Sequence, residues 1–155
     1  SINQVKQIDL YVDGADEITP NLSLLKGRGQ DLVMEKLLAQ AAHQFIVVAD
    51  KSKLVNFIGE KFIIPIEVMP NAWRIVKYHL EQHGAEGDIR LNANQDNIAV
   101  TASGNYVLDM RFPKNVDDQS LNILLNNTSG VVEHGLFYQL ADKILIADQG
   151  IVSSM

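Results

Sequence analysis

The first third of the chain follows a strand–helix–strand pattern of apolar and polar positions. Residues 8–12 have the composition of a short β-strand and end at a turn-like polar string. Residues 29–43 carry apolar side chains at helical spacing, and a continuous apolar run at 45–49 is typical of a buried parallel strand. The positions of this pattern that we expect to face a core are Met34, Leu38, Ala41 and Phe45. The order predicts a βαβ unit of a parallel sheet.

The middle of the chain predicts a second unit with a different character. Residues 63–68 form a candidate strand, in which Pro65 favours an edge position because proline donates no hydrogen bond to a neighbour. A helix is expected from Pro70 to about His83, with Gly84 as the residue that ends it.

A hairpin and a further helix complete this second unit. Residues 98–101 and 106–110 are predicted to pair around a turn that contains Gly104. Asp117 or Asp118 is expected to cap a helix that runs to Leu125, and residues 131–137 form a last strand. The resulting order, β-α-β-β-α-β, is that of a ferredoxin-like unit.

The end of the chain returns to the first pattern. Residues 143–147 form another buried-type strand. We therefore expect an α/β fold: a partial Rossmann-like parallel sheet from residues 1–63 and 140–155, with a small ferredoxin-like α+β domain, 64–139, inserted. Three parallel strands are fewer than the roughly four to six of an ordinary sheet. Apolar faces of this core are thus expected to need a partner chain or additional sequence upstream of Ser1.

Composition narrows the class of protein. With 155 residues, 46% of them hydrophobic, the chain has the size of one ordinary domain or two small ones. Its net charge of −6 argues against nucleic-acid binding. The chain has no cysteine, no apolar run of membrane-spanning length and no signal peptide, so we expect a cytoplasmic protein with no membrane contact. Because the first residue is Ser1, we expect a fragment or a processed product.

Candidate chemistry lies where the predicted parallel strands end, since ligands of open α/β sheets bind there. Asp13 and Asp16 follow the first strand, and Lys51 and Lys53 follow the second. Residues 26–29, Lys-Gly-Arg-Gly, lead into a helix N-terminus, where backbone N–H groups favour an anion. The spacing matches neither a P-loop nor a dinucleotide fingerprint.

Each of these features also has a purely structural interpretation. The two aspartates are frequent turn formers, and they do not fit an EF-hand. The loop 26–29 can be an ordinary helix entry, Glu35 a solvated helix residue, and Lys51 and Lys53 solubilising side chains. His79 and His83 have a spacing that can hold zinc, but no third ligand stands out, so no metal site is expected.

Taken together, the motifs of this chain resemble those of one family, the type A ribose-5-phosphate isomerases. The similarity covers nearly the whole chain, and the Asp-Gly-Ala-Asp-Glu string at 13–17 is its most specific part. The matching segments are 11–18, 25–29, 34–36, 45–50 with Ser52 and Lys53, 65–70 and 130–137.

The resemblance implies a cofactor-free interconversion of ribose 5-phosphate and ribulose 5-phosphate, in the pentose phosphate pathway, by a homo-oligomer such as a homodimer. It places the general base at Glu35, with Asp13 and Lys26 as further catalytic residues. The substrate-binding residues that it implies are Asp13, Gly14, Ala15, Asp16, Lys26, Gly27, Arg28, Gly29 and Lys53.

These residue types suit the reaction. A single carboxylate at Glu35 can take a proton from C2 of the sugar and return it to C1. Lys26 and the amides of residues 27–29 can stabilise the negative charge that develops on the sugar oxygens. Asp13 can exchange protons with the sugar hydroxyls and help to open the furanose ring, while Asp16 and Lys53 hold the rest of the sugar.

The sequence departs from the family at its beginning. Members begin with a further α/β portion that carries a Gly-Thr-Gly-Ser-Thr phosphate loop, and nothing like it occurs here. We therefore expect a truncated form, the C-terminal two-thirds of the enzyme, with weak or no activity on its own. Arg28 also stands where glycine is frequent, and it can supply charge to a phosphate.

Three other functions stay open at this point. The first is a non-catalytic sugar-phosphate sensor on a related fold, although Glu35 and Asp13 favour an enzyme because a sensor needs no base. The second is a fragment whose exposed sheet edge pairs with another chain. The third is a different isomerase or a deaminase on the same scaffold.

Overall fold

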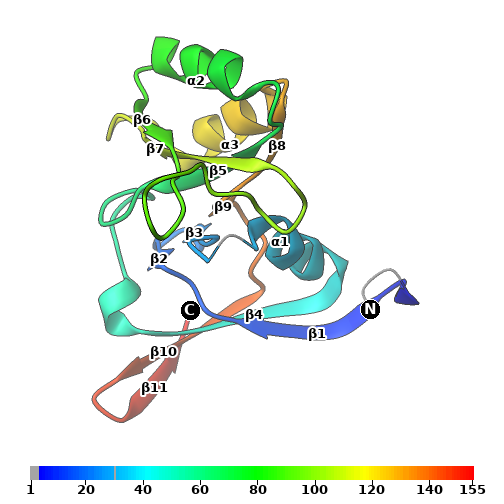
Figure 1. Ribbon diagram of the computed structural model, residues 1–155. Helices are drawn as coiled ribbons and strands as arrows, with labels where there is room; N and C mark the ends of the chain where they lie inside the picture. The colour runs from blue at the N-terminus through cyan, green and yellow to red at the C-terminus, as the bar shows by residue number, and fades with distance from the viewer. Residues whose placement is uncertain (1–3, 30) are drawn as a thin grey trace.

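The computed structural model describes residues 4–29 and 31–155, and its strands form three sheets in this part of the chain (Figure 1). The first sheet is parallel except for its last strand, which pairs antiparallel. Its spatial order is β1 (Ile8–Asp13), β4 (Ala42–Asp50), β10 (Lys143–Asp148) and β11 (Ile151–Ser154). The parallel sheet predicted from residues 8–12, 45–49 and 143–147 is confirmed.

The second sheet is antiparallel throughout. Its spatial order is β6 (Glu86–Ile89), β7 (Tyr106–Arg111), β5 (Ile64–Val68) and β8 (Val131–His134). Helices α2 (Trp73–Gln82) and α3 (Asp118–Asn127) pack on it and contribute Val76, Leu80, Leu121 and Leu125 to its core. The predicted order, β-α-β-β-α-β, is the order of this unit along the chain.

A third, very small sheet joins the other two. It consists of β2 (Glu17–Ile18), β3 (Leu24–Leu25) and β9 (Leu136–Phe137), all antiparallel. Strands β2 and β3 were not predicted from the sequence, whereas β9 falls within the predicted strand 131–137. Because β9 follows β8 and β3 leads into Lys26, this sheet brings the end of the second unit against the loop 26–29.

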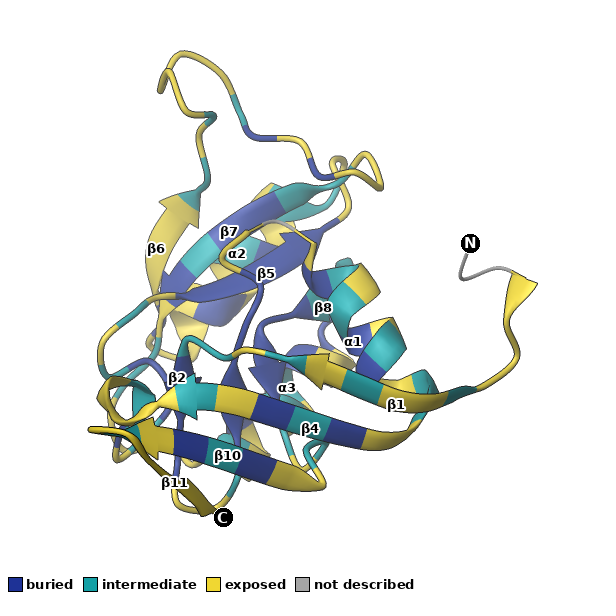
Figure 2. Cartoon of the chain, turned by 90° about the horizontal axis from the view of Figure 1, so that it is seen from below, coloured by how far each residue is buried: buried dark blue, intermediate teal, exposed yellow. Residues whose placement is uncertain are grey.

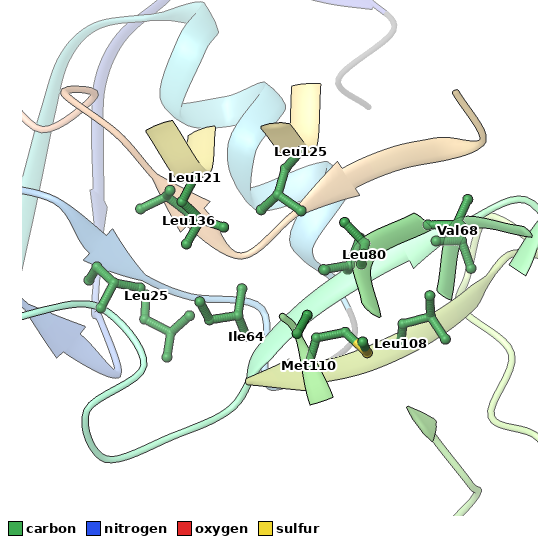
Figure 3. Packing of buried hydrophobic residues seen from close by; sticks show 13 residues of the cluster. Leu25, Ile64, Val68, Leu80, Leu108, Met110, Leu121, Leu125 and Leu136 are labelled. Atoms are coloured by element: carbon green, nitrogen blue, oxygen red, sulfur yellow. The ribbon is translucent and has the colours of Figure 1, made fainter. Parts of the chain in front are cut away.

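In the described part of the chain, most buried hydrophobic residues fall into two clusters. The larger one fills the space between the second sheet and its helices, and Leu25 and Leu136 extend it to the small sheet (Figure 3). The other cluster, which includes Phe45, Val47, Phe137 and Ile144, covers the face of the parallel sheet on which α1 (Leu32–Ala41) lies. The candidate site lies where the two units meet.

The opposite face of the parallel sheet is open. Leu10, Val12 and Val48 are 50%, 52% and 48% exposed, and no helix of the described residues covers this side (Figure 2). The expectation that a thin core leaves an apolar face uncovered is thus confirmed for the described chain. No helix among residues 4–29 and 31–155 is long and apolar enough to cross a membrane.

Predicted helix boundaries agree well where a capping residue marks them. Asp117 accepts a hydrogen bond from the backbone N–H of Ser120 (2.8 Å) at the start of α3. Gly84 follows α2 with a positive φ of 81°, and its N–H bonds to the carbonyl of Glu81. Such left-handed backbone is where glycine ends a helix at little cost.

The predicted core face of α1 is wrong. Met34 is 43% exposed, and Leu38 and Ala41 are only half-buried. Phe45 does face a core, as expected, but from β4 and not from the helix. The buried residues of α1 are Leu32, Lys36 and Ala39. This face can point inward because the ammonium of Lys36 forms an ion pair with Glu133 on β8. The spacing of hydrophobic residues along the helix contains no information about such a pair.

The predicted hairpin has the wrong first strand. The hairpin partner of β7 is β6, whereas Ile98 makes only an isolated bridge to Leu91, and residues 99–105 belong to no strand and include a turn at 102–104. Strand β6 was missed because its sequence, Glu-Gly-Asp-Ile, is polar and largely exposed. The predicted strand 131–137 is split at Gly135, between β8 and β9.

Pro65 does not lie in an edge strand, because β5 pairs with both β7 and β8. The pairing with β8 begins one residue later, at Ile66. The carbonyl of Pro65 accepts a hydrogen bond from the N–H of Gly135 (2.8 Å), just beyond the end of β8. A proline is therefore tolerated here, since the ladder needs no donor at this point.

Leu108, which is fully buried in the larger cluster, tests the importance of that core. We expect Leu108→Ala to lower the free energy of unfolding by about 2–5 kcal/mol, through lost burial and the cavity left behind. Ile75→Ala is the matched control, because Ile75 is 73% exposed. Its effect is expected within about 0.5 kcal/mol. Urea denaturation measures both, and equal losses would contradict this account of the core.

Candidate functional site

A cavity of about 290 Å³ opens at the carboxyl end of β1. It is lined by Asp13, Gly14, Ala15, Asp16, Lys26, Gly27, Arg28, Gly29 and Glu35. The structure thus brings together all of the predicted site residues except Lys53. They come from the end of β1, the loop after β3 and the first turns of α1.

Short-range pairing explains how these segments meet. Strands β2 and β3 pair Glu17 with Leu25, and the N–H of Asp16 donates to the carbonyl of Leu25 (2.8 Å). Lys26 therefore follows directly beside the turn 13–16. Gly27 has a positive φ of 87°, and a Cβ at this position would lie 2.5 Å from the Cβ of Leu32, so only glycine allows the loop to enter α1 this closely.

Lys26 is the centre of the site. Its side chain is only 4% exposed, and Nζ donates to Asp13 Oδ2 (2.8 Å) and to the carbonyl of Gly14 (2.7 Å). Glu35 Oε2 lies 3.2 Å from the same Nζ. One ammonium therefore joins the end of β1 to α1, and a buried charge of this kind requires such partners.

Glu35 is held less firmly than Asp13. Its Oε2 atom is buried and, among the described residues, receives no hydrogen bond of acceptable geometry, so its contact with Lys26 is an ion pair. The side chain of Glu35 is 25% exposed and lines the cavity. A carboxylate with an unoccupied acceptor site beside a cavity is suited to accept a proton.

Asp13 receives three hydrogen bonds from the described residues. Its Oδ1 accepts from the N–H of Gly14 (2.7 Å), and Oδ2 accepts from Lys26 and from the hydroxyl of Tyr11. Burial tends to raise the pKa of Asp13, but the hydrogen bonds from Lys26, Tyr11 and Gly14 outweigh it and hold this pKa below its ordinary value. Asp13 is thus an ionised acceptor at neutral pH.

Tyr11 was not predicted as a site residue. Its ring stacks on that of Phe45, with centroids 5.1 Å apart, and this packing directs its hydroxyl to Asp13. Burial and the hydrogen bond to Asp13 raise the pKa of Tyr11, so the hydroxyl remains a donor. The sequence did contain a signal, because residues two apart on a strand share a face.

Arg28 and Asp16 form the outer part of the site. The guanidinium Nη1 of Arg28 lies 3.6 Å from Asp16 Oδ1, and the group stacks 4.0 Å above the ring centroid of Phe62. Arg90 donates to the carbonyl of Arg28 (3.2 Å), which ties the loop to the second sheet. Since Arg28 is 50% exposed, its charge is available to an anion at the mouth of the cavity.

Glu17, the last residue of the Asp-Gly-Ala-Asp-Glu string, has a structural role. It is fully buried, and its carboxylate accepts hydrogen bonds from the N–H groups of Gly59 (2.6 Å), Lys61 (2.6 Å) and Phe62 (2.7 Å). These bonds fix the segment that leads into β5.

Lys53 does not line this cavity. It lies in a short 3₁₀ helix, η2 (Lys51–Lys53), and the neighbouring Leu54 bridges to Ile18. Its predicted substrate contact stays a prediction. Lys51 pairs with Asp148 (2.7 Å) on the surface.

The described residues contain no group of three or more His, Cys, Asp or Glu side chains that could hold a metal ion. The two histidines with zinc-like spacing, His79 and His83, lie beside each other, with ring centroids 4.7 Å apart.

The fold and the cavity together define an α/β protein with an ammonium–carboxylate cluster that is suited to proton transfer. Comparison with known proteins gives the family. The family model for ribose 5-phosphate isomerase A (phosphoriboisomerase A) matches residues 1–150. The chain belongs to this family.

Individual relatives agree with this assignment. The ribose-5-phosphate isomerase A of Thermococcus kodakarensis is 45% identical over 94% of this chain and 64% of its own length. A solved structure from Methanocaldococcus jannaschii, with 37% identity and a TM-score of 0.91, covers 99% of this chain and 68% of that one. The structure of a D-ribose-5-phosphate isomerase in complex with phospho-erythronic acid is 40% identical in sequence, with a TM-score of 0.93. The match covers 100% of this chain and 68% of that one. The chain therefore spans about two-thirds of the length of such relatives.

The hydrogen bond from Tyr11 makes the ionisation of Asp13 testable. In Tyr11→Phe we expect the pKa of Asp13 to rise toward its ordinary value, as measured by carbon-13 NMR titration of the carboxyl group. The depressed pKa stabilises the fold above the ordinary pKa, and this contribution is lost as pH falls through the folded-state pKa. The stability difference from wild type should therefore be present at neutral pH and disappear in acid.

Tyr78→Phe is the control for this experiment, because Tyr78 is 64% exposed and far along the chain, on α2. It should leave the titration of Asp13 unchanged. The same unchanged titration in Tyr11→Phe would contradict the role given to the tyrosine.

Proposed function

We propose that this chain carries the catalytic site of an isomerase that interconverts ribose 5-phosphate and ribulose 5-phosphate. The observation that carries the proposal is the placement of Glu35 Oε2 3.2 Å from Lys26 Nζ, at a cavity also lined by Asp13. Membership of the family supports it. So does the solved relative that binds phospho-erythronic acid, an aldonic acid phosphate whose planar carboxylate resembles an enediolate.

In the proposed reaction Glu35 is the base. Its carboxylate removes the proton from C2 of the open-chain aldose, and the electrons of that bond form the C1–C2 double bond of an enediol. The carbonyl oxygen at C1 gains a proton as the hydroxyl at C2 loses one. Glu35 then returns its proton to C1, which gives the ketose, so atoms and charge balance without a cofactor.

Lys26 and Asp13 assist this transfer. Among the described residues, the ammonium of Lys26 donates hydrogen bonds to Asp13 and Gly14, which leaves its third hydrogen for a sugar oxygen. Because the lysine is already buried and oriented, it stabilises the developing negative charge at little reorganisation cost; losing one such donor typically costs about 3–4 kcal/mol. Ionised Asp13 is the acceptor for a hydroxyl proton during ring opening.

Asp16, Arg28 and Lys53 bind the remainder of the substrate in this proposal. Asp16 accepts from sugar hydroxyls, and Arg28 supplies positive charge at the mouth of the cavity. The amides of residues 27–29 lie at the same opening and add donors for an anionic oxygen.

The finer description of the fold and of the cell biology is also a proposal. The strand order β6-β7-β5-β8 supports a ferredoxin-like domain at 64–139, inserted into a Rossmann-like core formed by 1–63 and 140–155. The uncovered face of the parallel sheet supports burial against further protein, and we propose a cytoplasmic homodimer in the pentose phosphate pathway.

Glu35→Gln in the full-length gene product tests the base. We expect kcat to fall by about 10²–10⁴-fold, because the amide cannot accept the C2 proton, while KM changes little. Glu81→Gln, on the outer side of α2, is the matched control and should turn over normally. Near-normal turnover by Glu35→Gln would remove the base assignment. Binding of ribose 5-phosphate without any turnover by wild type would favour the sensor instead.

A further inference from the structure

Lys36, the residue after Glu35, is as deeply buried as the lysine of the site. It is 4% exposed, and its Nζ lies 2.5 Å from Glu133 Oε1 and 3.3 Å from His134 Nδ1. Burial lowers the pKa of Lys36, and the charge of Glu133 opposes that effect. This contact joins α1 to the end of β8.

His134 extends the connection to a third element. An ammonium group can only donate, so Nδ1 of His134 must accept, and the proton of the neutral ring then lies on Nε2. In that tautomer Nε2 donates to Asn126 Oδ1, 3.1 Å away on α3. Burial and the charge of Lys36 both lower the pKa of His134 well below its ordinary value, which keeps the ring neutral. Among the described residues, no buried side-chain nitrogen or oxygen of this network lacks a hydrogen-bond partner.

The residues that follow on the chain contact the other lysine. The carbonyl of Gly135 accepts from the N–H of Lys26 (2.9 Å), and a Cβ on Gly135 would lie 2.4 Å from the carbonyl oxygen of Lys26. The ring of Phe137 lies 5.7 Å from Lys26 Nζ and 5.0 Å from Lys36 Nζ. One five-residue segment, 133–137, therefore contacts both lysines.

This arrangement matters for Glu35, since its carboxylate is not fixed by hydrogen bonds of its own among the described residues. Its position depends on how α1 is rotated about its axis. Successive helix residues are about 100° apart, so a firm contact at Lys36 also sets the direction of Glu35. Lys26 is held by the same segment, which sets the other end of the 3.2 Å contact.

We propose that Lys36 and the segment 133–137 are the positioning element of the site, which sets the separation between Glu35 and Lys26. Lys36 is a positioning residue, because it does not line the cavity. The expected effect on turnover rests on the proposed isomerase function. The expected effect on the separation between Glu35 and Lys26 does not depend on that function.

Lys36→Met in the full-length gene product tests the inference, with Lys36→Arg as the conservative variant. We expect kcat to fall by about 10²-fold, as for a misplacement of roughly 1 Å, with KM nearly unchanged. Lys36→Arg should restore a large part of kcat, because it keeps the charge. Lys77→Met is the control, since it removes a lysine from a more exposed 2.7 Å pair with Glu81. Wild-type kcat in a folded Lys36→Met protein would overturn the proposal.

Crystal structures of the wild type and of Lys36→Met give a readout that needs no turnover. We expect the separation between Lys26 Nζ and Glu35 Oε2 to lengthen beyond ion-pair distance in the variant, and an unchanged separation would overturn the proposal. If Lys36→Met does not fold, Glu133→Ala, which removes the acceptor of Lys36, replaces it under the same criteria. Should wild type lack isomerase activity, the proposed function fails while this measurement still decides the positioning role.

Discussion

A lysine ammonium that is almost completely removed from water must be surrounded by acceptors, and much of the site follows from this requirement at Lys26. The acceptors come from the end of β1 and from the first turn of α1, so β1 must end and α1 must begin beside the loop 26–29. Burying such a charge without partners costs several kcal/mol. The same cluster that satisfies the ammonium leaves Glu35 the least restrained of its carboxylates, and that is the group with room to accept a proton.

The second buried lysine, Lys36, also requires acceptors, and it lies on a face of α1 about 100° from that of Glu35. Its partners lie on β8, and Phe137 packs against both ammonium groups. The helix is thus held between two charge clusters instead of by an apolar stripe alone. This explains why α1 turns a lysine toward the interior and leaves Met34 and Leu37 largely exposed.

Local signals in the sequence were enough to predict the parallel strands and the charged turns of the cavity, whereas Glu35 entered the predicted site only through the resemblance to the family. Continuous apolar runs marked β4 and β10, and the loop 26–29 was identified by its glycines and charges. The orientation of α1 depends instead on a lysine–glutamate contact between residues 97 positions apart, which no periodicity contains. Strand β6 was missed because its polar, exposed sequence lacks a strand signal, and Pro65 was misplaced because its tolerance depends on where β8 ends.

Gly135 shows how far the influence of the site extends into the fold. It has no side chain, and the space that a Cβ would take is filled by the carbonyl of Lys26 and the ring of Pro65. Even alanine would push the loop and the end of the second sheet apart. In a library of single substitutions this glycine would therefore rank among the least tolerant positions, although it does not line the cavity. Its intolerance would report a spacing between backbones and not a chemical role.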